Sequence, residues 1–293
     1  MLPERTALSS YINFKIAEPN RLVLANSVAA TGKYLTGTIT KEKIETIEFK
    51  LGKEQPEGTA EIFDASEKQD ESIIGYYTDT DGNNLYELTF ASDEVIATNK
   101  NAQYLFQNLT NLTSIEFNNF STYGVTGMQQ MFYNCSGLTT VNLSNFNTTN
   151  VIDMQSMFGN CSGLTTLDLS NFDALKLTNT NAIFVGLDSL ETLSLSNFNA
   201  PKLTDHNINS MFSGLVYLKT LNLSNFNAPE LTDISAIFSG LGSLETLNLS
   251  NFNAPKITDM HRVFYGLNNL SNLDLSNFNT ANVTDMSYMF TGW

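Results

Sequence analysis

The side chains best suited to proton transfer are two histidines, His206 and His261, and they do not form a catalytic pattern. A nucleophile or a general base needs partner groups within hydrogen-bond reach, and motifs such as GxSxG or HExxH are typical of such arrangements. The chain contains neither motif and no phosphate-binding glycine loop. The pairing of His261 with Asp259 is expected by chance near the start of a turn. We therefore expect no catalytic residues and no enzymatic activity.

Aspartates recur at one position of a sequence segment, or phrase, that the chain repeats several times. A carboxylate at the start of a helical turn accepts free backbone N–H groups, and we expect this capping role here. The alternative is a cation held between Asp233 and Asp259, because carboxylates on neighbouring repeats repel each other. Asp79-Thr80-Asp81-Gly82-Asn83 also hints at calcium, but it lacks the spacing and closing glutamate of an EF-hand. We assign no metal and no cofactor. The recurring residues are Asp153, Asp205, Asp233, Asp259 and Asp285.

The two cysteines, Cys135 and Cys161, stand at the same position of adjacent copies of the phrase, where other copies have leucine. We expect them to be buried core thiols. The alternative is a disulfide, since neighbouring strands of a sheet bring Cα atoms within the range that a disulfide spans.

The composition limits the partners of the chain. Its 293 residues include 15 basic and 30 acidic ones, for a net charge of −15, which disfavours binding to nucleic acid or to an anionic membrane surface. No apolar run approaches the roughly 18 residues of a membrane span. The first residues, MLPERTALSSYINFK, have no apolar core of an export signal. We expect either that the chain is not exported by that route or that a signal has been removed.

The elements that must position these residues belong to a repeat. Seven copies fill residues 109–293, and we number the positions of each copy from 1. Leucines at positions 7 and 9 flank a polar residue, which predicts a strand. Apolar positions 20, 23 and 24 have the spacing of a helical turn, and glycine follows at position 26. Such self-similarity predicts a solenoid whose parallel strands stack about 4.8 Å apart. The copies begin at Leu109, Cys135, Cys161, Leu187, Leu215, Leu241 and Leu267.

A column of stacked phenylalanines is expected at position 12, from Phe120 to Phe278.

Residues 1–108 hold most of the charged side chains and lack the repeat. Alternation in 43–51 predicts a strand, and 72–90 predicts a hairpin that turns at Asp81-Gly82. The segment 97–108 ends like a repeat, since Leu105-Phe106 matches Met131-Phe132. We interpret 1–108 as a β-rich region that caps the first repeat, with 1–39 unplaced.

The phrases CSGLTTLDLSNFD (161–173) and NVTDMSYMF (282–290) resemble those of the BspA-like bacterial surface proteins, which have leucine-rich-type repeats of the same length. The resemblance covers about 41–293. It implies an α/β fold: a leucine-rich-repeat solenoid with a parallel sheet of short strands, short helical turns opposite, and an N-terminal β-rich cap. It also implies a bacterial protein at the cell surface or outside the cell, usually an adhesin, with no catalytic residues to transfer.

Differences between the copies, rather than the shared phrase, are where we expect specificity. The strand face is small and polar, turn positions 15 and 16 vary, the fourth copy inserts two residues near 206–210, and Tyr288 lies near the same edge as Tyr265. Drift in exposed loops explains such variation equally well. The partner-binding candidates are Asn222, Asn248, Tyr217, Lys202, Glu230, Lys256, His206, His261 and Tyr265.

The favoured function is a non-enzymatic module that binds a protein or glycan on a host or neighbouring cell. The alternatives are a structural spacer that presents another domain, or a phage or secreted host-recognition protein. Trp293 stands at position 1 of a further copy, so we expect either a longer chain or end-to-end self-association of the last repeat through its apolar edge.

Overall fold

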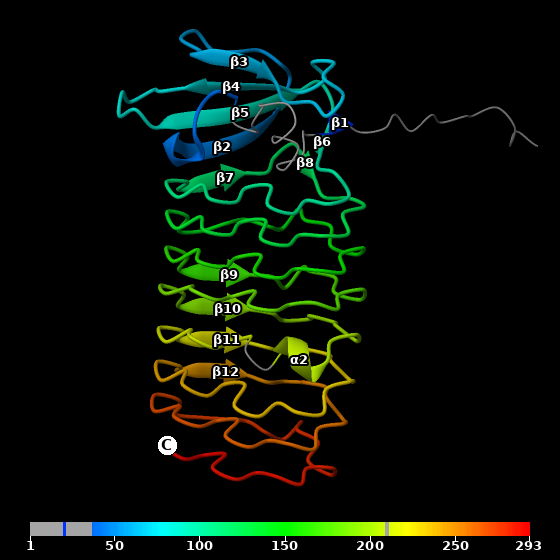
Figure 1. Ribbon diagram of the computed structural model, residues 1–293. Helices are drawn as coiled ribbons and strands as arrows, with labels where there is room; N and C mark the ends of the chain where they lie inside the picture. Colours follow the sequence, from blue (N-terminus) through cyan, green and yellow to red (C-terminus); the bar gives the residue numbers. More distant parts are fainter. Residues whose placement is uncertain (1–19, 22–36, 209–210) are drawn as a thin grey trace, which may run out of the picture.

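The structure is a computed structural model that describes residues 20–21, 37–208 and 211–293. The unplaced region 1–39 lies mostly outside the described residues. Figure 1 shows a layered stack, with an N-terminal sheet at one end and the repeats following one another to the C-terminus. The elements are β1 (Asn20–Arg21), η1 (Lys41–Lys43), β2 (Ile44–Leu51), β3 (Glu61–Asp64), β4 (Ile74–Thr78), β5 (Tyr86–Ser92), β6 (Ile96–Ala97), β7 (Ser114–Glu116), β8 (Phe120–Ser121), β9 (Thr166–Asp168), β10 (Thr192–Ser194), α2 (Asp205–Ile208), β11 (Thr220–Asn222) and β12 (Thr246–Asn248).

The N-terminal strands continue into the first repeat. A five-stranded sheet has the order β3-β4-β5-β2-β7, in which β4 and β5 form the expected antiparallel hairpin. Strand β2 pairs in parallel with β7 of the first repeat, with Ile47 opposite Ile115. The half-repeat at 101–108 also joins the stack, because the N–H of Phe106 donates to the carbonyl of Met131 at 2.9 Å. One hydrophobic core therefore runs from Ile44 to Met289.

The short strands of the repeats stack in parallel and in register, as the Leu-x-Leu phrase predicts. Strands β9, β10, β11 and β12 form one sheet, in which the buried position-7 leucines are partners. Each strand is only three residues long and buries its central residue. A repeat alone cannot bury its apolar side, so each copy depends on its neighbours. The leucines in register are Leu167, Leu193, Leu221 and Leu247.

The prediction of short helical turns opposite the strands is wrong. Among the described residues, the only α-helix is α2, a four-residue segment in the insertion of the fourth repeat, and η1 is a single 3-10 turn. The solenoid is therefore built of strands and turns and is not a leucine-rich-repeat α/β fold. Position 22 adopts a left-handed backbone in six of the repeats, which stops a helix after one turn. Its residues are Gln130, Ser156, Ala182, Ala236, Arg262 and Tyr288, with φ between 51° and 57°.

Hydrogen bonds between repeats replace those of a helix. In the second repeat the N–H groups of Met154, Ser156 and Phe158 donate to carbonyls of the third repeat at 2.9, 2.9 and 3.2 Å. The intervening N–H groups close tight four-residue turns, as in Met157 to the carbonyl of Met154 at 3.1 Å. A single isolated helical turn is costly to nucleate, whereas the next repeat offers acceptors already in place. The spacing of the apolar residues at positions 20, 23 and 24 fits both a helical turn and the observed turns that bond to the next repeat.

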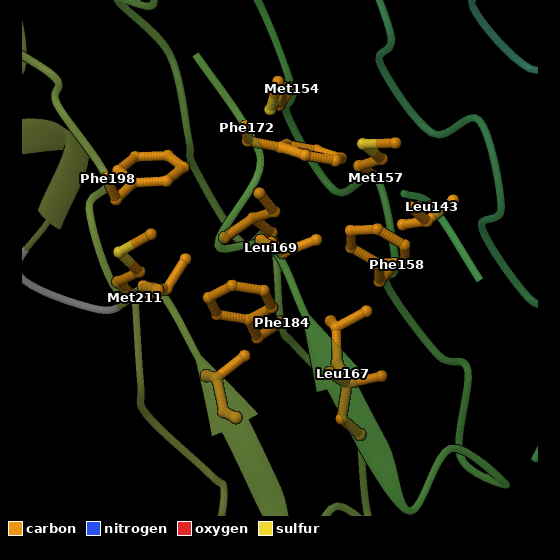
Figure 2. Close-up of a cluster of buried hydrophobic side chains, with 14 of the residues drawn as sticks. Leu143, Met154, Met157, Phe158, Leu167, Leu169, Phe172, Phe184, Phe198 and Met211 are labelled. Carbon is orange, nitrogen blue, oxygen red and sulfur yellow. The ribbon is translucent and has the colours of Figure 1, made fainter. Parts of the chain in front are cut away.

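Two aromatic columns run through the core. The expected column at position 12 includes Phe198, Phe226 and Phe252, whose neighbouring ring centroids lie 5.7 and 5.5 Å apart. A second column at position 24 stacks Phe212 on Phe238 at 5.8 Å. Figure 2 shows how leucine and methionine side chains fill the space between phenylalanines in the middle of the stack.

Both cysteines are buried and unbridged. Each thiol donates to a backbone carbonyl of the preceding repeat or half-repeat, Cys135 to Phe106 at 3.0 Å and Cys161 to Phe132 at 2.9 Å. Burial raises the pKa of the Cys135 thiol well above its usual value, and the neighbouring Cys161 raises it further. The thiol interpretation is thus confirmed over the disulfide.

In the part of the chain that the structure describes, we find no helix with the length and apolarity that crossing a membrane requires.

Candidate functional site

The nine predicted partner-binding residues lie at five different places around the repeat. Two occupy the strand face, three a turn, one the insertion, one the loop before the strand and two the turn opposite the strands. The structure brings together only candidates from the same place, either on neighbouring repeats or, for His261 and Tyr265, within one repeat.

The strand-face candidates, Asn222 and Asn248, are partners in the sheet and half-buried. Each side-chain carbonyl accepts the N–H of the residue two positions later, Ser224 and Ser250, at 3.0 Å. These asparagines therefore help to end the strand. Their amide N–H groups are what remains for a partner.

The turn candidates Lys202, Glu230 and Lys256 share position 16 of successive repeats and are exposed. Lys256 forms an ion pair with Glu230 at 2.7 Å, and both side chains are about half exposed. Exposed pairs of this kind contribute about 0–1 kcal/mol. The pair neutralises two of the three charges at this turn.

His206 and Tyr217 stand apart from the other candidates. His206 is exposed on α2, and Tyr217 is 60% exposed in the loop before β11. A shallow cavity of about 420 Å³ opens on the side of the repeats near the insertion, lined by Asn181, Ala182, Val185 and Ser213. None of these four lining residues is titratable.

His261 and Tyr265 belong to a group of side chains in contact at the surface, which we call the Arg262 cluster: His261, Arg262, Tyr265, Ser287 and Tyr288. The guanidinium of Arg262 lies 5.6 Å from the ring centre of Tyr265 and 5.4 Å from that of Tyr288. The imidazole of His261 meets the Tyr288 ring edge-on, with centroids 5.8 Å apart. The tyrosines remain 39% and 60% exposed. One cation is thus held by two aromatic rings at the surface.

The backbone beneath the cluster is bound on both sides. The N–H of Arg262 donates to the carbonyl of Ser287 at 3.1 Å, and the carbonyl of His261 accepts from the N–H of Ala236 at 2.8 Å. Cluster residues from adjacent repeats occupy equal positions, so stacking brings them together. The cluster exists only because the sixth and seventh repeats lie in register.

A hydrogen-bond chain leads from the cluster to Asp285. The Ser287 hydroxyl donates to the Asp285 carboxylate at 2.6 Å and lies 2.7 Å from Nδ1 of His261. Because the hydroxyl hydrogen points to the carboxylate, Nδ1 must be the donor to Ser287. The side-chain and backbone hydrogen bonds from Ser287 lower the pKa of Asp285, and His261 lowers it further.

This chain does not have the order of a hydrolytic triad. In a triad the imidazole lies between the hydroxyl and the carboxylate and accepts the hydroxyl proton. Here the hydroxyl lies between the other two groups, and its proton faces a carboxylate made less basic by its hydrogen bonds. The arrangement orients the imidazole instead, with Nε2 as its second polar atom.

Comparison with family models identifies the repeats. The model of a family described as Mycoplasma protein of unknown function, DUF285, matches residues 100–216 and 206–293. The chain belongs to this family. No similar curated protein and no similar solved structure was found.

The DUF285 match begins at the half-repeat and covers all seven repeats, so the Arg262 cluster lies within its second segment. Among the described residues of this DUF285 chain, no three His, Cys, Asp or Glu side chains converge as metal ligands. Asp233 and Asp259 are bridge partners, and each carboxylate accepts an N–H of its own turn, from Ser235 at 2.7 Å and His261 at 2.8 Å. The expected acceptance of free N–H groups is thus confirmed, although no helix follows.

Sequence reasoning selected His261 and Tyr265 and placed Tyr288 near the same edge, but it left Arg262 and Ser287 out of the candidate set and predicted none of the contacts between them. The signal that finds them is the repeat itself. His261 and Ser287 share position 21, and Arg262 and Tyr288 share position 22. Comparison of equal positions in adjacent repeats would have predicted both contacts.

Proposed function

We propose that this DUF285 protein is a non-enzymatic binding module that acts at the bacterial cell surface or outside the cell, where it attaches to a host or neighbouring cell. The observation that carries the proposal is the Arg262 cluster. Tyrosine and arginine are enriched among residues that dominate binding energy, and here both kinds are exposed, in contact and mounted on a rigid backbone. The similarity of the repeated phrases to those of BspA-like surface proteins supports the same conclusion.

The rest of the surface supports binding at one place rather than along the whole array. Side chains on the strand face are small and polar, and those at the variable turn are partly paired with one another. The net charge of −15 supports a partner that is neither a nucleic acid nor an anionic membrane.

Binding of the fluorescently labelled full chain to host epithelial cells tests this function. Variants should copy what other repeats carry at the same positions: Arg262→Ala follows Ala182 and Ala236, and Tyr265→Ser follows Ser213 and Ser239. The fold accommodates these residues already, so a loss of binding reports on the surface. We expect saturable binding that both variants weaken at least tenfold, about 1.4 kcal/mol.

Lys68→Ala, at an exposed lysine of the N-terminal region that is not a partner-binding candidate, is the matched control and should bind like the native chain. The proposal fails if cells bind all four proteins equally, or bind none of them while circular dichroism shows each one folded.

A structural spacer is the second candidate. Its support is the regular stack in Figure 1 and the many side chains that bond to the neighbouring repeat, such as Asn251 to Asn225 at 2.9 Å. A spacer would place its attached domain away from the cell and would leave cell binding unchanged in the Arg262→Ala variant.

A further inference from the structure

We propose that Arg262 binds the carboxylate of an acidic sugar, a pyranose ring carrying one carboxylate within an otherwise neutral glycan. The proposal deepens the binding function proposed above and names its ligand. It rests on the geometry of the Arg262 cluster and on the charge of the whole chain.

Arg262 is held in place but has no counter-ion. In the described part of the chain its guanidinium forms no ion pair and donates no hydrogen bond, although the protein carries twice as many acidic as basic residues. The two aspartates of the same turns are already engaged: Asp259 accepts the N–H of His261 at 2.8 Å, and Asp285 accepts both the N–H and the hydroxyl of Ser287. Two rings therefore position a cation whose five N–H donors are available.

The cost of ordering this side chain is met before a ligand arrives. A guanidinium is attracted to the face of an aromatic ring even at an exposed site, and Arg262 lies over two rings. The backbone at Arg262 is fixed in the left-handed region, with φ of 55°, by hydrogen bonds to the next repeat. Such preorganisation lowers the entropy lost on binding. A guanidinium held in this way is suited to an oxyanion that fits its planar fork.

A carboxylate fits that fork through two parallel hydrogen bonds. The tyrosines on either side offer apolar ring surface together with hydroxyl groups, which suits the C–H faces and hydroxyls of a sugar ring. Nε2 of His261 adds a further polar atom, because Nδ1 is committed to Ser287. Carboxylate, apolar face and hydroxyls are all features of one acidic sugar.

The charge of the chain favours a single carboxylate over a dense polyanion. At physiological salt the Debye length is about 8 Å, so the net charge of −15 repels an acidic polymer wherever the polymer lies along the protein surface. A ligand with one carboxylate on a neutral chain meets Arg262 at contact distance and adds little repulsion elsewhere. The same reasoning disfavours a strongly acidic protein surface as the partner.

Isothermal titration calorimetry with the full chain tests the proposal. The probes are a disaccharide that ends in a hexuronic acid, its methyl ester, the corresponding neutral disaccharide, and a neutral-flanked peptide with a single glutamate. We expect the acid to bind, and the ester and the neutral sugar to bind at least about tenfold more weakly, because they lack the charged acceptor. Arg262→Ala should remove binding of the acid, and Arg262→Lys should weaken it about tenfold because the fork is lost. Lys68→Ala, at an exposed lysine of the N-terminal region, should leave it unchanged.

The other outcomes overturn either the inference or the proposed function, and they distinguish the two. Equal affinities for the acid and its ester would show that the carboxylate is not recognised. A higher affinity for the peptide than for the acid would assign the site to a protein partner. Absence of binding by all four probes, with cell attachment still dependent on Arg262, rejects the sugar and keeps the proposed function. Binding of the acid without any cell attachment keeps the site and rejects the adhesive function.

Discussion

At the scale of single residues, the side chain of Asp205 replaces a backbone hydrogen-bond acceptor that other repeats supply. In other repeats the N–H at position 18 donates to the carbonyl of the same position in the previous repeat, as Thr258 does to Thr232 at 2.7 Å. In the fourth repeat α2 uses that carbonyl, since Asn207 donates to Thr204 at 3.0 Å. The Asp205 carboxylate takes its place and accepts the N–H of Thr232 at 2.7 Å, its hydroxyl at 2.6 Å and the N–H of Asp233 at 3.1 Å.

We expect Asp205→Ala to lower the free energy of unfolding by about 1–2 kcal/mol, because three donors lose their protein acceptor and only water replaces it. Urea unfolding followed by circular dichroism measures the change. Asp188→Ala, at an exposed aspartate of the same repeat, is the control and should change stability by less than about 0.5 kcal/mol. Equal effects of the two substitutions would contradict the role given to Asp205.

Asp205 also predicts a pH dependence. Burial alone would raise the pKa of Asp205, but the hydrogen bonds from Thr232 and Asp233 outweigh it and hold the pKa below its usual value. A lowered native pKa stabilises the fold above the unfolded-state value of about 3.9, and the contribution is lost as the pH falls through the native pKa. The stability difference between the native chain and Asp205→Asn should therefore shrink below about pH 4.

Ser287 should control the ionisation of Asp285. Its side-chain hydrogen bond is the largest cause of the lowered pKa of Asp285, so Ser287→Ala should raise that pKa toward the ordinary aspartate value. A carboxyl-carbon titration by NMR measures the shift. Asp274, whose pKa is lowered in the same way by Ser276, is the internal control and should not move. An unchanged Asp285 pKa would show that the hydroxyl does not donate to it.

At the scale of elements, the columns of phenylalanine determine how the repeats hold together. Phe198 is fully buried and stacks on Phe226 at 5.7 Å, so each ring contacts the next repeat as well as its own. The strands alone are three residues long and could not supply this cohesion.

Phe198→Ala should therefore lower the free energy of unfolding by about 3–5 kcal/mol, the usual cost of removing a buried aromatic side chain. Phe290→Ala removes a ring that is 47% exposed and should cost clearly less. Chemical unfolding of both variants gives the comparison. Similar losses would mean that the interior column is not packed more tightly than the last repeat.

The paired thiols allow a chemical test of the same packing. Cys135 and Cys161 are buried, and burial raises the pKa of Cys135, so neither should react with a thiol reagent in the folded chain. Titration of non-reduced protein in denaturant should then find two thiols. Rapid labelling of the folded chain would show that the repeats around Cys135 open readily.

At the scale of the whole molecule, the fold is a stack with one continuous core and a strongly acidic surface. Its stability comes from contacts between neighbouring repeats, and its function depends on what individual repeats place on the outside. The Arg262 cluster is the best example, since a cationic and aromatic group stands on a chain of net charge −15.

Much of the architecture could be predicted from the amino-acid sequence. The regular period of the repeat specifies stacked parallel strands, the Leu-x-Leu phrase specifies their register, and the phenylalanine at position 12 specifies an aromatic column. These features can be predicted because they depend on the spacing and burial of apolar side chains. That spacing recurs in all seven copies of the repeat.

The turn opposite the strands and the candidate site were decided only by the tertiary structure. Positions 20, 23 and 24 fit a helical turn equally well, and the choice depended on carbonyls that the next repeat supplies. The contacts of Arg262 with Tyr265 and Tyr288 were recognised only in the structure, because Tyr288 comes from the following repeat. In both cases the deciding partner is about one repeat away along the chain and only one layer away in space, so a pattern within one repeat does not contain it.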